Sequence, residues 1–279
     1  MYNINKKIIN INYIKERIGV VLSPAKTLDF NKKNNDLPMT KPYFIKEARS
    51  LVEELKTYDI ISLEKLMKIS NKLAVLNKEK FQEWDESLDN AIQCSLAFKG
   101  EAYRGLDIGS YNVEDYFYAN DHLRILSGLY GVLRPFDGIN FYRLEMGTKL
   151  NFNEYKNLYE FWNDKIINRL YEELKSHKEK KIINLASNEY FKSIEKIGEF
   201  KDVQVINIAF KELKDYKYKI VTVKAKRARG LMSSFIIKNQ IETIEEIKKF
   251  DVEGYEYNEE LSSNSELVFT RDNNIFQID

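Results

Sequence analysis

The chain has 279 residues, and 43% of them are hydrophobic, enough for the core of one large domain or two small ones. Its 44 lysines and arginines nearly balance 43 aspartates and glutamates, so the formal charge of +1 excludes a uniformly basic nucleic-acid coat protein. Cys94 is the only cysteine, which excludes an intramolecular disulfide and fits a reducing cytosol.

The sequence predicts neither a membrane span nor a secretory signal. No apolar run approaches the roughly 18 residues that a spanning helix needs, and residues 1–17 lack the apolar core of a signal peptide. We therefore expect a cytoplasmic protein with no membrane partner. Residues 1–17 are expected to be a weakly ordered extension, and residues 18–279 a single domain, because no repeat, linker or heptad marks a boundary.

The first strand is predicted at Gly19–Leu22, where a short apolar run is followed by the loop Ser-Pro-Ala-Lys-Thr at 23–27. Ser23 and Lys26 make this strand-end loop a candidate anion site, because hydroxyl and backbone N–H groups bind oxygens while the ammonium supplies charge. The loop lacks the glycines of a Walker motif.

Helical spacing of apolar residues predicts core helices over 44–55, 62–76 and 158–174. Ser62 is expected to be the N-cap of the second helix. The apolar run 91–98 predicts a helix end or a strand that delivers Lys99 to a turn. Gly100 follows it directly, so the Lys99 amine can approach a ligand along bare backbone.

A glycine-rich stretch covers residues 126–147. The apolar run 116–126 predicts a helix that ends near Ser127, with Gly128 as its left-handed residue. Arg134 and Arg143 should then lie on an irregular, exposed segment, where planar guanidinium groups suit an anionic ligand. Gly128 and Gly131 are candidate hairpin glycines whose backbone N–H groups can face a phosphate.

The second half of the chain predicts strands at 182–185, 203–210, 218–223 and 266–269. Ser187 and a helix beginning at residue 188 follow the first of these strands, and Glu189 lies in that helix. Two strand ends side by side in a parallel sheet should open on one crevice. The densest basic run, 224–229, is expected to continue the strand 218–223 until Gly230 breaks it.

Several motifs occur in order: SPAKT (23–27), AFKG (97–100), LSGLYGVLRP (126–135), YRLEMG (142–147), NLAS (184–187), EYFK (189–192) and ARGLMS (228–233). Together they resemble the YaaA family over about residues 18–271. The resemblance implies a bacterial cytoplasmic protein of the peroxide stress response. It also implies an unusual single-domain α/β fold, with a mixed sheet flanked by helices, a basic cleft and a helix-hairpin-helix-like element. In the common form of that element one residue separates the two glycines, whereas two separate Gly128 from Gly131.

The favoured function is DNA binding through that cleft, which would help to limit iron-dependent oxidative damage. Phosphate contacts need only local lysine and arginine, and no recognition helix is evident, so we expect contacts mainly to the duplex backbone. The candidate cations are Lys26, Lys99, Arg134, Arg143, Lys192, Lys224, Arg227 and Arg229.

The alternative function is an enzyme that acts on a nucleotide or a nucleic-acid base. Ser23, Glu145 and Glu189 are its candidate catalytic residues, and Glu145 beside Arg143 is either a general acid or base with an oxyanion clamp or a structural ion pair. A third possibility is a stress-induced scaffold for a protein partner. No metal site or cofactor is expected, because His122, His177 and Cys94 lack ligand spacing.

Overall fold

The computed structural model describes residues 18–31, 34, 36–175 and 179–272, so the expected extension 1–17 lies outside the described residues. The strands of the main sheet are β1 (Ile18–Leu22), β5 (Leu123–Ser127), β6 (Gly131–Leu133), β8 (Lys180–Leu185), β9 (Val203–Lys214), β10 (Lys217–Lys219), β11 (Glu256–Tyr257) and β12 (Glu266–Arg271). Their order is β11-β12-β9-β8-β1-β5-β6, and β10 pairs with the outer end of β9. Two small sheets pair β2 (Thr27–Leu28) with β4 (Phe98–Lys99) and β3 (Ile92–Gln93) with β7 (Gly138–Ile139).

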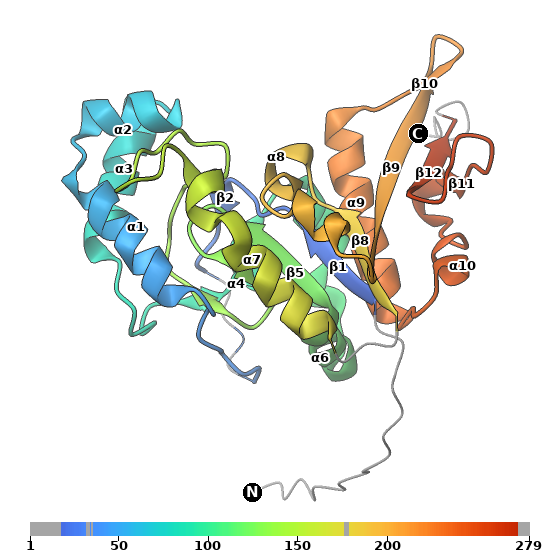
Figure 1. Cartoon of the computed structure of the whole chain (residues 1–279), viewed down its shortest axis with the longest axis horizontal. Helices are drawn as coiled ribbons and strands as arrows, with labels where there is room; N and C mark the ends of the chain where they lie inside the picture. The colour runs from blue at the N-terminus through green and yellow to red at the C-terminus, as the bar shows by residue number, and fades with distance from the viewer. Residues whose placement is uncertain (1–17, 32–33, 35, 176–178, 273–279) are drawn as a thin grey trace, which may run out of the picture.

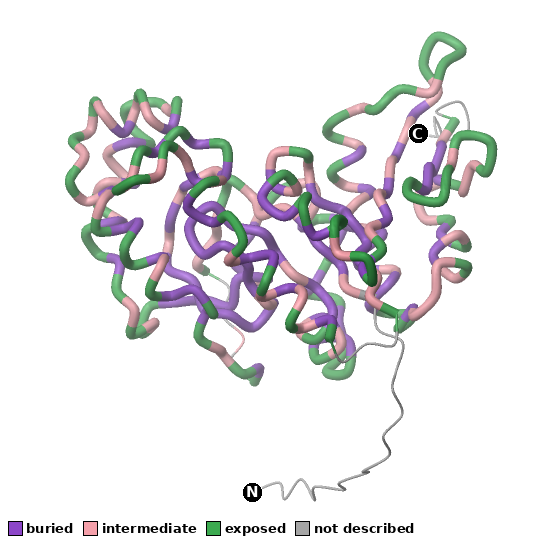
Figure 2. The backbone as a smooth tube through the Cα atoms, in the orientation of Figure 1, coloured by how far each residue is buried: buried purple, intermediate pink, exposed green. Residues whose placement is uncertain are grey.

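The five central strands, from β12 to β5, run parallel, whereas β6, β10 and β11 are antiparallel additions. Parallel strands are buried on both faces and need helical connections, which explains the apolar composition of β1 and β8. The buried side chains form one contiguous core, and purple backbone runs through the sheet in Figure 2. The predicted mixed α/β fold with a flanked sheet is therefore confirmed.

Helix α7 crosses one face of the sheet and α9 follows the opposite face (Figure 1). The helices are α1 (Ile45–Thr57), α2 (Ile60–Met67), α3 (Asn71–Glu83), α4 (Cys94–Ala97), α5 (Glu101–Leu106), α6 (Val113–His122), α7 (Leu158–Leu174), α8 (Asn188–Phe191), α9 (Thr222–Lys238) and α10 (Ile244–Ile247), with short 3-10 turns η1 (Ile108–Ser110), η2 (Glu195–Glu199) and η3 (Val252–Gly254). The predicted helices at 44–55 and 158–174 are confirmed, as are the strands at 19–22, 182–185, 203–210 and 266–269.

The predicted helix 62–76 is wrong, because two helices occupy this region. Asp59, not Ser62, caps α2 and accepts a hydrogen bond from the Ser62 amide at 2.7 Å. Lys68 takes a left-handed conformation (φ 52°) and ends α2, after which α3 begins at Asn71. The apolar spacing continues across the break, so periodicity alone does not reveal it.

The glycine-rich stretch also differs from its prediction. Helix α6 ends at His122, and β5 follows at once because Leu123 pairs with Val20 of β1. Residues 127–131 form the turn between β5 and β6, in which Gly131, not Gly128, has a positive φ (69°). The element is thus a hairpin of two strands, and the helix-hairpin-helix assignment at this position is wrong. The turn is buried, with Ser127 Oγ accepting the amide of Tyr130 at 3.0 Å.

The basic run 224–229 is helical, so its prediction as a strand is wrong. Only Lys217–Lys219 is strand, and α9 begins at Thr222. Gly230 lies inside α9 and lets α5 approach closely. A Cβ there would overlap the carbonyl oxygen of Ala102 and lie 2.7 Å from the amide nitrogen of Leu106. This contact sets α9 beside the segment 99–103.

Candidate functional site

The carboxyl ends of β1 and β8 lie side by side, as the sequence predicts for two parallel strand ends. Leu22 pairs with Leu185 in register. The Ser23 hydroxyl accepts the Ser187 amide at 2.8 Å and donates to the Ser187 hydroxyl at 3.3 Å. These bonds fix both loops at the edge where ligands of α/β sheets bind.

A cavity of about 280 Å³ opens at this edge, and we call it the strand-end cavity. Its walls are the loops after β1 and β8, residues 99–103, and Lys226 and Arg229 of α9. Tyr103 donates from its hydroxyl to the carbonyl of Ser23 at 3.1 Å and closes the wall between α5 and β1. The close α5–α9 contact at Gly230 brings the two α9 cations to the cavity.

Four cations line the strand-end cavity: Lys26, Lys99, Lys226 and Arg229. Three of the predicted phosphate ligands, Lys26, Lys99 and Arg229, are therefore brought together. Lys99 lies 3.8 Å from Asp29, a weak ion pair, whereas Lys26 pairs closely with Glu145 at 2.6 Å.

Arg229 differs from the other cations of the cavity. Its side chain is half-buried, and among the described residues it has neither an ion-pair nor a hydrogen-bond partner. Burial without a carboxylate lowers the pKa of Arg229 from its ordinary value. A guanidinium stays charged in proteins, so this one offers five unused donors to an anion in the cavity.

Arg143 and Glu145 adjoin the cavity through Lys26. Glu145 accepts Lys26 with one carboxylate oxygen and Arg143 with the other, the latter at 3.1 Å. The Arg143 Nε is buried and has no hydrogen-bond partner in the part of the chain that the structure describes. Glu189 lines the cavity and accepts the Gly147 amide at 2.9 Å.

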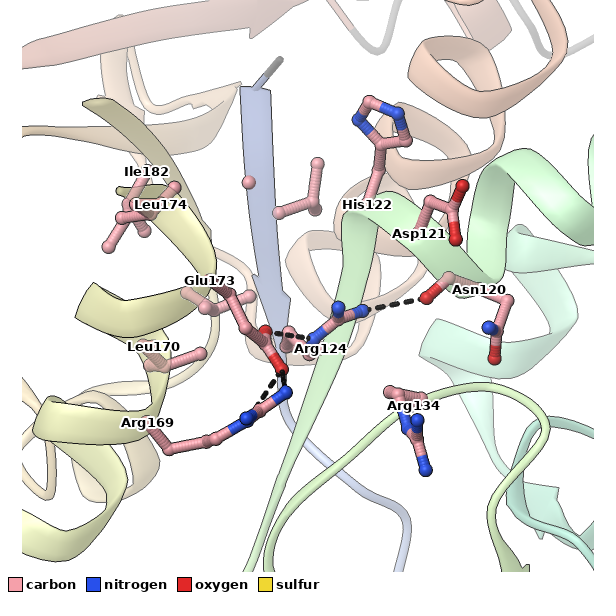
Figure 3. A pocket seen from close by; sticks show the side chains of 13 residues that line it. Asn120, Asp121, His122, Arg124, Arg134, Arg169, Leu170, Glu173, Leu174 and Ile182 are labelled. Carbon is pink, nitrogen blue, oxygen red and sulfur yellow. Dashed lines mark hydrogen bonds and ion pairs between the residues drawn. The ribbon is translucent and has the colours of Figure 1, made fainter. Parts of the chain in front are cut away.

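Arg134 lies elsewhere, so the prediction of one cleft holding every candidate cation is wrong. It lines a separate cavity of about 260 Å³ between α7 and the sheet, where Arg124 and Arg169 share Glu173 (Figure 3). Arg134 pairs with the buried Asp137 at 2.7 Å. The Asp137 carboxylate, three residues away in the same turn, neutralises the positive charge of Arg134 that was expected to bind phosphate.

Lys192, Lys224 and Arg227 also stay outside the strand-end cavity. Lys192 lies 5.0 Å above the Tyr159 ring. Lys224 pairs with buried Glu212 at 3.0 Å, and Arg227 pairs with Glu253 at 2.6 Å. The helical period of α9 turns Arg227 away from Arg229, so the basic run divides between a structural ion cluster and the cavity.

An open groove continues from the strand-end cavity at Glu189, which lines both. This α2 groove, about 600 Å³, lies between the end of α2 and residues 145–149. Its cations are Lys65, Lys68 and Lys149. None of the three is among the cations that the sequence singles out for phosphate binding. Nor is Lys226, which a helical reading of the basic run would have placed with Arg229.

A sequence model of the family described as peroxide stress protein YaaA matches residues 18–261. The chain belongs to this family. A UPF0246 protein of Clostridium botulinum is 64% identical over 255 residues, which cover 91% of this chain and 99% of that protein. UPF0246 proteins of Clostridium perfringens and Saccharophagus degradans are 53% and 47% identical, again over 90% of this chain and nearly all of their own length.

The predicted resemblance to the YaaA family is thus confirmed. Within the described ranges of this YaaA-family chain, no group of three or more histidine, cysteine or acidic side chains is placed to hold a metal ion. His177 lies outside these ranges, and His122 stacks on Tyr118 at 3.8 Å. None of the helices described here is both long and apolar enough to cross a bilayer.

Proposed function

We propose that this YaaA-family chain binds DNA in the cytoplasm during peroxide stress, with one nucleotide unit held in the strand-end cavity. The contacts are made mainly to the sugar-phosphate backbone. In this proposal DNA binding is how the chain helps to limit iron-dependent oxidative damage.

Arg229 carries the proposal. A half-buried guanidinium without a carboxylate partner among the described residues costs desolvation free energy that an anionic ligand would recover. Its planar donors match the oxygens of a phosphate. Lys99 and Lys226 line the same cavity and add charge around the same ligand.

The size of the cavity sets the form of DNA that fits. About 280 Å³ admits a phosphate with its sugar, but not a duplex. The strand must therefore be single or locally unpaired where it enters. Its neighbouring phosphates would follow the α2 groove, over Lys65, Lys68 and Lys149, which meets the cavity at Glu189.

Salt dependence tests this proposal directly. Affinity of the full chain for a fluorescent single-stranded DNA is measured by anisotropy at a series of salt concentrations. The slope of log affinity against log salt is negative, and each lost phosphate contact reduces its magnitude by about 0.7. Arg229→Gln should show that loss and bind roughly tenfold more weakly, whereas a Lys201→Ala control, altered at an exposed lysine outside the cavity, should match the wild type. Equal slopes for Arg229→Gln and the wild type would refute the proposal.

An enzyme acting on a nucleotide is the second candidate, and Glu189 favours it. Among the described residues, the structure uses one of its carboxylate oxygens, which accepts the Gly147 amide, while the side chain lines the cavity. Glu145 suits the role less well, since both of its oxygens are held by cations. If the chain releases base or phosphate from a nucleotide, Glu189→Gln should abolish the release without weakening DNA binding, because it removes a negative charge from the cavity.

A further inference from the structure

The hairpin of β9 and β10 forms an arm at the same edge of the sheet as the strand-end cavity. The last residue of β9 paired with β8 is Asn207, yet β9 continues to Lys214. On its other side β9 stays paired with β12 as far as Glu212, so Leu213, Lys214 and the hairpin turn extend beyond the sheet. In Figure 1 the hairpin rises clear of the body above the α9 helix. We call residues 213–220 the β9–β10 arm.

One feature of the arm opposes its folding, and a second leaves a large aromatic side chain unburied. Lys214 and Lys217 face each other across the ribbon, and like charges directly opposite are destabilising. Neither has an ion-pair partner among the described residues, whereas Lys219 pairs with Asp215 at 3.0 Å. At the tip, Asp215 (φ 50°) and Tyr216 (φ 61°) take the left-handed conformation that a two-residue hairpin turn requires, and the Tyr216 side chain is fully exposed.

The surface of the arm is continuous with the strand-end cavity. Ile220 and Val223, at the base of the arm, are 58% and 61% exposed. Val223, Lys226 and Arg229 follow one another at intervals of three along α9, so each is next to the following one, in a strip that slants by about 120° around the helix. This strip leads from the arm to the guanidinium in the cavity.

We propose that the β9–β10 arm is a second contact for the DNA strand whose nucleotide unit occupies the strand-end cavity. The inference rests on the proposed function. Lys214 and Lys217 bind successive phosphates, which removes their mutual repulsion, and Tyr216 stacks on a base. From Arg229 to the tip the path is roughly 20 Å, which spans several nucleotides of a single strand. A mononucleotide therefore reaches the cavity only.

The experiment compares two ligands and three proteins. The ligands are a single-stranded DNA of about 20 nucleotides and a deoxynucleoside monophosphate. The proteins are the wild type, Lys214→Ala/Lys217→Ala, and Lys46→Ala/Lys201→Ala, a charge-matched control at exposed lysines away from the arm. The arm variant should reduce the magnitude of the salt slope for the long DNA by about 1.4 and leave mononucleotide affinity unchanged. The control should change neither.

The outcomes separate the two proposals. If Arg229→Gln weakens the long DNA while the arm variant keeps the wild-type slope, the arm inference is wrong and the proposed function stands. If the wild type binds neither ligand, both are wrong. Tyr216→Ser should weaken the long DNA about tenfold without changing mononucleotide affinity. An unchanged affinity for the long DNA would overturn the stacking role. Melting temperatures of all variants are compared, because these exposed substitutions should leave folding intact.

Discussion

Gly230→Ala tests whether the contact between α5 and α9 builds the strand-end cavity. The new Cβ would overlap the Ala102 carbonyl oxygen and lie 2.7 Å from both the Ala102 carbonyl carbon and the Leu106 amide nitrogen. All three atoms belong to the backbone, so no side-chain rotation can relieve the clash. The helices must separate by on the order of 1 Å to restore ordinary contact distances.

The expected loss is about 2 kcal/mol of unfolding free energy. Overpacking of this kind lowers the unfolding free energy by about 3 kcal/mol. Replacing a helical glycine by alanine raises it by about 1 kcal/mol. For a chain of this size the melting temperature should fall by about 6 °C. Displacing α9 also moves Arg229, which lines the cavity, so DNA affinity should fall as well.

Thermal unfolding followed by circular dichroism measures the first effect, and anisotropy the second. Gly109→Ala is the matched control, because a Cβ at that position meets nothing within 4 Å. It should be neutral or stabilise by up to about 1 kcal/mol. If Gly230→Ala melts at the same temperature as Gly109→Ala, the helices are not held by backbone contact and the argument for the cavity wall fails.

Three further predictions concern the stability and reactivity of the fold. Glu212→Gln should cost about 3 kcal/mol in urea unfolding, because it leaves Arg271 and Lys224 without the buried carboxylate that they contact at 2.8 and 3.0 Å. Burial raises the pKa of Glu212, but hydrogen bonds from Tyr255, Arg271 and Lys224 outweigh it and hold the pKa below 4.5. Its contribution is therefore present above about pH 4.5 and lost as the pH falls further, a loss that the variant should not show. Burial also raises the pKa of the Cys94 thiol, so a thiol reagent should label it slowly in the native protein and fully in urea. Asn112→Ala should remove the capping box of α6 and cost about 1 kcal/mol, read as a lower melting temperature.

The meeting of the two strand ends could be predicted because parallel strands place their carboxyl ends at one edge. Ser23, Lys26 and Glu189 follow from that rule alone. The helical structure of the basic run 224–229 could not be predicted in the same way. Thr222 and Val223 are β-branched and suggest a strand, but packing of Gly230 against α5 favours a helix there.

The sequence also could not show which cations remain free to bind phosphate. Arg134 and Arg227 look as suitable for phosphate as Arg229 until their partners are known. Asp137 is only three residues from Arg134, and its position follows from the turn, but Glu253 reaches Arg227 from 26 positions away. Ion pairing between distant segments depends on the completed fold, so composition cannot separate neutralised cations from free ones.

The bond between Ser23 and Ser187 spans 164 positions of the chain, and Arg229 is added later still. An emerging polypeptide therefore has no complete ligand cavity until α9 has left the ribosome. Pairings between such distant segments also form slowly, because the chain loses the entropy of closing a long loop before the new contacts stabilise it. Ligand capture should consequently report on fully synthesised molecules, and fragments that stop before α9 should remain inert toward the ligand even where their first strands have formed.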